Sequence, residues 1–187
     1  MPVIKDNFSR RHRNQPIKFD IRSLAISEID QVIPLLQANV KDRITKEPIT
    51  DDVWAIKRFI NGEPDECNRV RHYLAAYDSS GKILGIMAYS TLDPAMIRHF
   101  DTIDQGKAIE ILNAFVHPFA QKGGVGKALF NYIADISRQL GRKYLVCSSG
   151  PRYYAGWGFH DKMFDTRKGF LQDGQGDYGI MTWIKRL

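Results

Sequence analysis

The sequence predicts a mixed α/β domain with a mostly antiparallel central sheet and helices on both of its faces. Some short stretches are alternating or continuously apolar, as in strands, whereas in others apolar residues recur every three or four positions, as on one helix face. The turn signal Asp78-Ser79-Ser80-Gly81 joins two strand-like stretches into a hairpin. Short strands interspersed with amphipathic helices place the chain in the α/β class.

The first half of the chain contains two predicted helices and three predicted strands. Ser27 and Asp51 are positioned to cap the helices, and Pro34 predicts a kink in the first one. The expected elements are a strand over 17–23, helices over 27–40 and 51–60, and hairpin strands over 70–78 and 82–91.

The second half contains the longest predicted strand and the longest predicted helix, joined by a loop rich in glycine. Gly141 is suited to end that helix, because glycine tolerates the left-handed conformation. The expected elements are a loop or short helix over 93–101, a strand over 108–116, a helix over 125–140, a strand over 143–147, a helical turn over 151–157, strands over 159–164 and 178–184, and a connection over 169–177.

Length and composition fit one domain of 187 residues, with no apolar run near the roughly 20 residues that span a bilayer. The charged amino-terminal stretch has no apolar core, so we do not expect a secretory signal. The two cysteines, Cys67 and Cys147, form no ligand cluster with histidine, so neither a disulfide framework nor a metal site is expected. A reducing cytoplasm is the expected compartment.

The net charge of +6 is concentrated at the amino terminus, where five basic residues outnumber a single acidic residue, Asp6. The basic residues are Lys5, Arg10, Arg11, Arg13 and Lys18. We therefore divide the chain into a basic arm, residues 1–16, and a single domain, residues 17–187. Such an arm could attract nucleic acid, but no aromatic residues interleave with its arginines. A solvated tail or packing arm is the favoured interpretation.

The stretch Gln121-Lys122-Gly123-Gly124-Val125-Gly126-Lys127 carries the strongest indication of function. A strand, a glycine-rich loop and a helix start in that order collect backbone N–H groups that can bind phosphate. A P-loop is excluded because Ala128 stands where a hydroxyl is needed, and the dinucleotide fingerprint fails at Leu129. The alternative is a glycine-rich turn that merely joins two elements.

The remaining pattern, Q-x-x-G-x-G, resembles the acyl-CoA loop of the GCN5-related N-acetyltransferase (GNAT) superfamily. A second segment, Tyr153-Tyr154-Ala155-Gly156-Trp157-Gly158-Phe159, resembles that family's F-Y-x-x-x-G-F segment and lies at the right distance from the loop. The chain departs from the family at Cys147, where asparagine is common. The resemblance implies a GNAT fold in which strand 108–116 splays from strand 143–147.

The resemblance also implies which residues hold coenzyme A, the expected co-substrate. Two would bind the pantetheine arm through their main chains, and the loop would hold the pyrophosphate. The cofactor-binding residues implied in this way are Phe115, Val116, Gln121, Lys122, Gly123, Gly124, Val125, Gly126 and Lys127.

Two residues are candidates for catalysis of acyl transfer from a thioester to an amine. Tyr154 falls on the family position of the general acid, and a phenol stays protonated at pH 7. Glu110 matches the base of the histone acetyltransferase branch, and Asn113 could orient a water in its place. The alternatives are a tyrosine packed on the sheet and a carboxylate paired with a basic neighbour.

The expected activity is acetyl transfer from acetyl-CoA to a small or protein amine. A regulator that binds acyl-CoA without turnover, and a nucleic-acid-associated protein that uses the basic arm, are the alternatives. Acidic residues near the predicted acceptor side would suit a cationic amine, but they serve equally as caps and turn formers. They are Asp42, Glu47, Asp51, Asp52, Asp173 and Asp177. The family resemblance is compatible with a homodimer.

Overall fold

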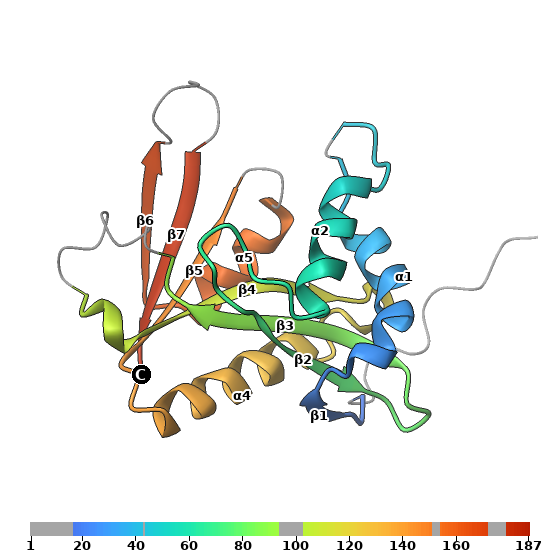
Figure 1. The fold of residues 1–187 in the computed structure, drawn as a ribbon, viewed down its shortest axis with the longest axis horizontal. Coiled ribbons are helices and arrows are strands. Elements are labelled where there is room, and N and C mark those ends of the chain that lie inside the picture. Colours follow the sequence, from blue (N-terminus) through green and yellow to red (C-terminus); the bar gives the residue numbers. More distant parts are fainter. Residues whose placement is uncertain (1–16, 43, 94–102, 151–153, 172–178) are drawn as a thin grey trace, which may run out of the picture.

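The computed structural model describes residues 17–42, 44–93, 103–150, 154–171 and 179–187. The arm predicted over 1–16 and most of the segment 93–101 therefore lie outside the described residues. Within them no helix is both long and apolar enough to span a lipid bilayer. The alternation of strands and helices predicts the architecture well, and Figure 1 shows a twisted sheet covered on both faces.

Seven strands form one mixed sheet in the order β1-β2-β3-β4-β5-β7-β6. All neighbouring pairs are antiparallel except β4 and β5, which run parallel. The strands are β1 (Asp20–Ser23), β2 (His72–Tyr77), β3 (Ile83–Thr91), β4 (Ala108–Val116), β5 (Tyr144–Ser149), β6 (Thr166–Leu171) and β7 (Gly179–Arg186). This arrangement confirms the predicted fold class.

Helices cover the two faces of the sheet separately (Figure 1). On one face, α1 (Ile29–Asn39) and α2 (Thr50–Ile60) pack their apolar stripes on β2 and β3. On the other face, α4 (Val125–Gln139) packs on β2, β3 and β4, and α5 (Tyr154–Met163) packs on β5 and β7. The burial of alternate strand residues on both faces explains why most strands contain few polar positions.

Two predicted helix caps differ from the structure. Ser27 does not cap the first helix: a short 3-10 turn, η1 (Ile26–Glu28), precedes α1, and the Glu28 carboxylate accepts the N–H of Ala25 at 3.0 Å. The second helix begins one residue before Asp51 and has no side-chain cap. Pro34 lies inside α1, which runs continuously through it.

The predicted strand over 159–164 is wrong, because this segment belongs to helix α5. Phe159 and Met163 are four residues apart, so a helix brings both onto the apolar core of the α4 face. The predicted connection over 169–177 is also partly wrong. Its first residues belong to β6, where Gly169 pairs with Met181 and has no room for a Cβ beside the Met181 sulfur.

Candidate acyl-CoA site

Strands β4 and β5 separate in the middle of the sheet. They pair from Ala108 with Tyr144 to Ile111 with Cys147, and no further. Beyond that point β4 continues beside β3 to Val116, whereas β5 continues beside β7 to Ser149. Figure 1 shows β5 rising away from β4 together with β7. The predicted splay is therefore confirmed, and it leaves one edge of β4 without a neighbouring strand.

The main chain of Val116 faces this splay. The N–H of the next residue, His117, donates to the carbonyl of Leu84 in β3 at 2.8 Å. Because backbone groups alternate along a strand, the N–H and C=O of Val116 point away from β3. The Phe115 carbonyl instead faces β3, 2.9 Å from the position a Cβ on Gly85 would occupy. Val116 is thus the one of the two whose main chain can meet a ligand in the splay.

The loop after β4 curls tightly before α4. A 3-10 turn, η3 (Pro118–Ala120), is followed by two residues in the left-handed region, Lys122 at φ 66° and Gly124 at φ 88°. Gly124 is at the N-cap of α4, where glycine adopts this conformation without steric cost. Gln121, Lys122 and Lys127 are exposed, and the Gln121 side chain donates to the Val116 carbonyl at 3.3 Å.

The first turn of α4 presents backbone donors that have no acceptor within the helix. Its first helical hydrogen bond runs from Ala128 N–H to the Gly124 carbonyl at 3.0 Å, so the N–H groups of Val125, Gly126 and Lys127 have no acceptor within the helix. No side chain caps this end. The helix dipole adds about half a positive charge there, so the end suits an anionic group.

Two glycines let the loop pack closely against neighbouring segments. A Cβ on Gly123 would lie 2.6 Å from Ile17, and a Cβ on Gly126 would lie 3.3 Å from the ring of Phe159 in α5 and 3.5 Å from Val116. The loop, the end of β4 and α5 are therefore in mutual contact.

Helix α5 contacts both the end of β5 and the start of α4. Trp157 donates its indole N–H to Ser149 at the end of β5 (3.2 Å), while Phe159 packs against Gly126 at the start of α4. Tyr154, the predicted acid, is the first residue of α5, so its main chain lies just beyond the end of β5. Its side chain and residues 151–153 lie outside the described part.

Glu110, the predicted base, is buried in β4 in the part that still pairs with β5. Its Oε2 accepts Arg69 Nη1 at 2.6 Å and the backbone N–H of Asp93 at 3.2 Å. Arg69 also pairs with Asp65 at 2.7 Å and with Asp93 at 3.2 Å. Burial raises the pKa of Glu110, against the opposing effect of the Arg69 guanidinium. Sequence reasoning missed Arg69, since it lies 41 residues from Glu110 along the chain.

A second polar cluster holds the point where β4 leaves its regular register. Asn113 has φ 45° at a bulge opposite β3, and its Oδ1 accepts Tyr73 Oη at 2.8 Å and Arg71 Nη1 at 3.0 Å. The Arg71 guanidinium stacks on the ring of Phe59 in α2, 3.8 Å from its centroid. Left-handed asparagine is sterically tolerated, and these contacts fix its side chain. The positive φ of Asn113 could not be anticipated from its neighbours.

Cys147 is buried and lies near His160 of α5, with its sulfur 3.7 Å from Nδ1. Burial raises the pKa of the Cys147 thiol and lowers that of His160 to about 4. Both shifts favour the neutral form of these groups at pH 7. Cys147 is therefore a small buried side chain, and sequence reasoning missed the histidine that contacts it.

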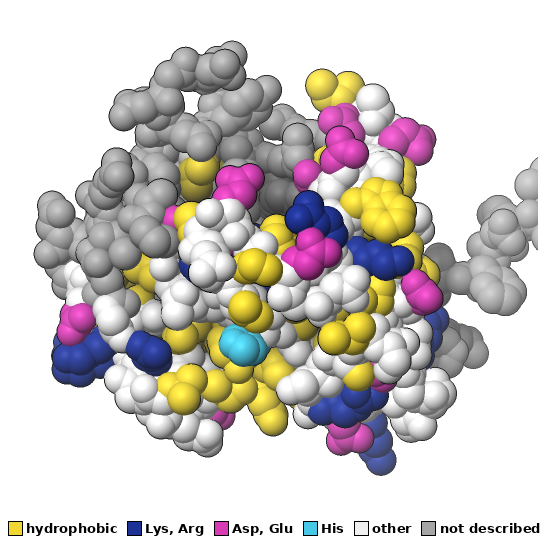
Figure 2. All heavy atoms as spheres, viewed as in Figure 1, with side chains coloured by type: hydrophobic (Ala, Val, Ile, Leu, Met, Phe, Trp, Pro, Cys, Tyr) yellow, Lys and Arg dark blue, Asp and Glu magenta, His cyan; other side chains and the backbone are white. Residues whose placement is uncertain are grey.

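The acidic residues near the predicted acceptor side mostly have local structural roles. Figure 2 shows acidic side chains over the upper end of α2 and the connection before it. Asp42 accepts the N–H groups of Ile44 and Thr45 at 2.8 Å each, and Asp51 and Asp52 lie in the first turn of α2. Asp173 and Asp177 lie outside the described residues.

Solved structures with the same fold share little sequence with this chain. A GNAT-family acetyltransferase from Staphylococcus aureus Mu50 has a TM-score of 0.63 at 11% identity, covering 90% of this chain and 99% of its own. PaiA N-acetyltransferase from Thermoplasma acidophilum, in complex with coenzyme A, has a TM-score of 0.60 at 14% identity, covering 91% and 100%. An IAA acetyltransferase from Bacillus cereus has a TM-score of 0.55 at 14% identity, covering 91% and 100%.

No curated protein sequence matches the chain. The model of the acetyltransferase (GNAT) family, however, matches residues 39–164, which include the β4 splay, the glycine loop and all of α5. The match covers about two thirds of the sequence and agrees with the fold of the solved structures. This chain belongs to the GNAT acetyltransferase family.

Proposed function

We propose that the protein transfers an acyl group, in the first place acetyl, from the thioester of acetyl-CoA to an amine. The observation that carries this proposal is the open edge of β4 next to the N–H groups at the start of α4 that have no acceptor within the helix. Family membership supports an acyl-CoA co-substrate, and the loop offers the diphosphate of coenzyme A donors of the right charge. The acceptor is a small-molecule or protein amine.

The residues that would hold coenzyme A divide by position. Phe115 and Val116 border the pantetheine arm, with the Val116 N–H and C=O directed into the splay. Gly123, Gly124, Val125 and Gly126 supply main chain around the diphosphate. Gln121, Lys122 and Lys127 are exposed at the rim, where two ammonium groups add positive charge.

The reaction forms one C–N bond and breaks one C–S bond. The neutral amine attacks the thioester carbonyl carbon, and the departing sulfur takes the proton of the Tyr154 hydroxyl. Glu110, directly or through a water, accepts the proton lost by the amine, and among described residues both hydrogen bonds to this carboxylate are made to Oε2. The raised pKa of Glu110 makes it a stronger base than an exposed carboxylate. Binding both reactants side by side lowers the entropic part of the barrier.

A second candidate function is an acyl-CoA-binding regulator without turnover. The tight ion pair between Glu110 and Arg69 favours it, because a carboxylate held at 2.6 Å by a guanidinium can serve structure alone. In that case the cofactor site would be intact while Tyr154 and Glu110 take no part in chemistry.

The test is thiol release from acetyl-CoA in the presence of a panel of amines, together with calorimetry of coenzyme A binding. We expect Tyr154→Phe to lower kcat by about 10²–10⁴-fold, the usual contribution of a general acid, with coenzyme A affinity unchanged. Tyr132→Phe, at an exposed tyrosine of α4, is the matched control and should leave both unchanged.

Three results would contradict parts of the proposal. Undiminished turnover in Tyr154→Phe would show that Tyr154 is not the general acid. Coenzyme A binding without turnover on any amine would favour the regulator. Absence of coenzyme A binding would overturn the assignment as a whole.

A further inference from the structure

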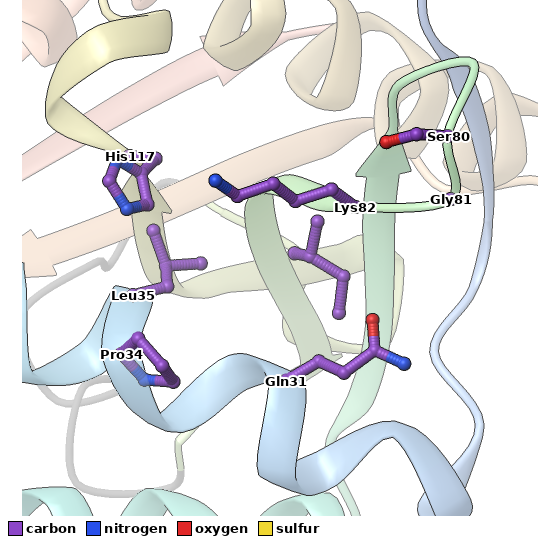
Figure 3. A pocket seen from close by; sticks show the side chains of 8 residues that line it. Gln31, Pro34, Leu35, Ser80, Gly81, Lys82 and His117 are labelled. Carbon is purple, nitrogen blue, oxygen red and sulfur yellow. The ribbon is translucent and has the colours of Figure 1, made fainter.

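A pocket of about 550 Å³ lies on the α1 side of the sheet, between α1, the β2–β3 turn and the end of β4 (Figure 3). Its volume is in the range of small-molecule sites. It is separate from the proposed cofactor cleft, because it opens on the β3 side of β4 whereas the cleft lies on the β5 side. Pro34, Leu35 and Ile83 supply its apolar wall, and Gln31, Lys82 and His117 supply polar groups.

The polar groups of the pocket carry positive charge that no lining residue balances. In Figure 3 Lys82 extends across the pocket with its ammonium directed toward His117. Among the described residues this ammonium forms no ion pair; it lies 4.7 Å from the centroid of the Phe119 ring. The nearby Asp78 interacts electrostatically with Lys82 but forms no ion pair with it among the described residues, and its Oδ1 accepts the N–H groups of Ser80 and Lys82 and the Ser80 hydroxyl.

The imidazole of His117 has a buried nitrogen without a partner. Nδ1 is inaccessible to solvent, and no hydrogen-bond partner for it is found in the described part of the chain. Buried polar atoms are almost always satisfied, and a turn of the imidazole toward the pocket would give this nitrogen access to a partner there. Burial and the neighbouring Lys82 charge both lower the pKa of His117, which an anion between the two would reverse.

We propose that this pocket binds a small organic carboxylate, with its charged end between Lys82 and His117 and its short apolar chain on Pro34, Leu35 and Ile83. One carboxylate oxygen would accept from the Lys82 ammonium, and the other from an imidazole nitrogen that turns toward the pocket. The apolar half of the lining favours a carboxylate with a hydrocarbon part over free phosphate, which would place oxygens against Leu35 and Ile83.

The pocket is connected to the loop through His117. The carbonyl of this residue accepts the N–H groups of Ala120 and Gln121, at 2.8 and 3.1 Å, and its own N–H donates to Leu84. A ligand that fixes the imidazole therefore touches the residue from which the glycine loop begins. The binding itself does not depend on the proposed acyltransferase activity.

The test is a titration of the full chain with hexanoate, monitored by NMR of the His117 ring and the methyl groups of Leu35 and Ile83. We expect saturable shifts of these signals with hexanoate and none with equal concentrations of hexylamine or inorganic phosphate. Lys82→Met keeps the aliphatic stem and should weaken hexanoate binding about tenfold, the order expected for one charge-assisted contact. Lys82→Arg should restore most of the affinity.

Lys143→Met is the matched control, because this exposed lysine precedes β5 at the opposite end of the sheet from His117. Equal shifts with hexylamine, equal hexanoate affinity in Lys82→Met, or a response to phosphate alone would overturn the proposal. A final arm compares coenzyme A with 3′-dephospho-coenzyme A. If only the former shifts these signals and blocks hexanoate, the pocket serves the 3′-phosphate of the co-substrate, and the separate carboxylate site is refuted.

Discussion

The two halves of β4 use different interactions, although they belong to one strand. The amino-terminal half, Ala108–Ile111, is paired on both sides, and its buried Glu110 is fixed by the side chain of Arg69. The carboxyl-terminal half is paired only with β3 and leads into a loop whose donors are main-chain N–H groups. A backbone site needs little more than glycine and a helix start, whereas a buried charge needs partners from distant segments.

The largest expected effect concerns the amino-terminal half. Arg69→Met would leave Asp65, Asp93 and Glu110 without their shared cation, and we expect it to lower the free energy of unfolding by about 3–5 kcal/mol, as for a broken buried ion pair. Urea denaturation measures this. The control Arg138→Met breaks an exposed pair with Asp135 and should cost about 1 kcal/mol or less.

The double variant Arg69→Met, Glu110→Leu distinguishes two causes of lost stability: the loss of side-chain packing and the burial of a charge without its partner. It should recover part of the stability, because it removes the carboxylate that the single variant leaves buried without its cation. If the free energy of unfolding of Arg69→Met stays within about 1 kcal/mol of the wild-type value, the amino-terminal half of β4 does not depend on the buried ion pair, and the contrast between the two halves fails.

The second effect concerns the junction, where Cys147 pairs with Ile111 at the last position before the strands part. His160 contacts Cys147, and its pKa is lowered to about 4 by burial. Between pH 6.5 and about pH 4, His160 binds a proton in the unfolded state but not in the folded state. Stability should therefore fall by about 2 kcal/mol between pH 7 and pH 5.

Urea denaturation at a series of pH values checks this effect. His160→Gln should flatten the dependence between pH 7 and pH 5, whereas the control His72→Gln, at an exposed position of β2, should retain it. An unchanged slope in His160→Gln would show that another group causes the acid sensitivity.

The smallest effect on stability, and the sharpest on binding, concerns the carboxyl-terminal half. Gly124 and Gly62 both have φ 88°, and a Cβ on either would have nothing within 4 Å. Gly124→Ala and Gly62→Ala should therefore each lose about 1 kcal/mol of stability through backbone strain. Only Gly124→Ala displaces the first N–H groups of α4, so only it should weaken coenzyme A binding, by about tenfold in calorimetry.

Wild-type coenzyme A affinity in Gly124→Ala would contradict a diphosphate site at the start of α4. Equal loss of affinity in both would mean that the effect reports global destabilisation. The pair thus distinguishes a local backbone site from a general requirement for a stable fold.

Periodicity and turn signals were sufficient to predict the sheet class, both helix layers and the hairpin, whereas the splay beside the glycine loop was implied by the resemblance to the GNAT superfamily. These features depend on short-range periodicity, on glycine and on motif spacing, all of which can be read within a few residues. The helix at 154–163 was mistaken in part for a strand, because Gly156 and Gly158 obscure the four-residue spacing of Phe159 and Met163. Strand β6 depends on pairing with β7 rather than on its own pattern.

The side-chain partners of the site could not be predicted. Arg69 meets Glu110 only because the segment between α2 and β2 folds over the start of β4, and Tyr73 meets Asn113 across 40 positions of sequence. Single-sequence patterns contain no information on such pairs. The roles of Tyr154 and Glu110 remain predictions.

The contact between Ile17 and Gly123 has a practical consequence for protein engineering. The strand boundaries alone suggest that the domain could be trimmed to Asp20, where β1 begins. The Ile17 side chain, however, packs against Gly123. Removing it would expose the glycine-rich turn to solvent. Shortened versions intended for crystallisation or ligand soaking should keep residue 17, or an apparent failure to bind could reflect the trimming and not the chemistry of the site.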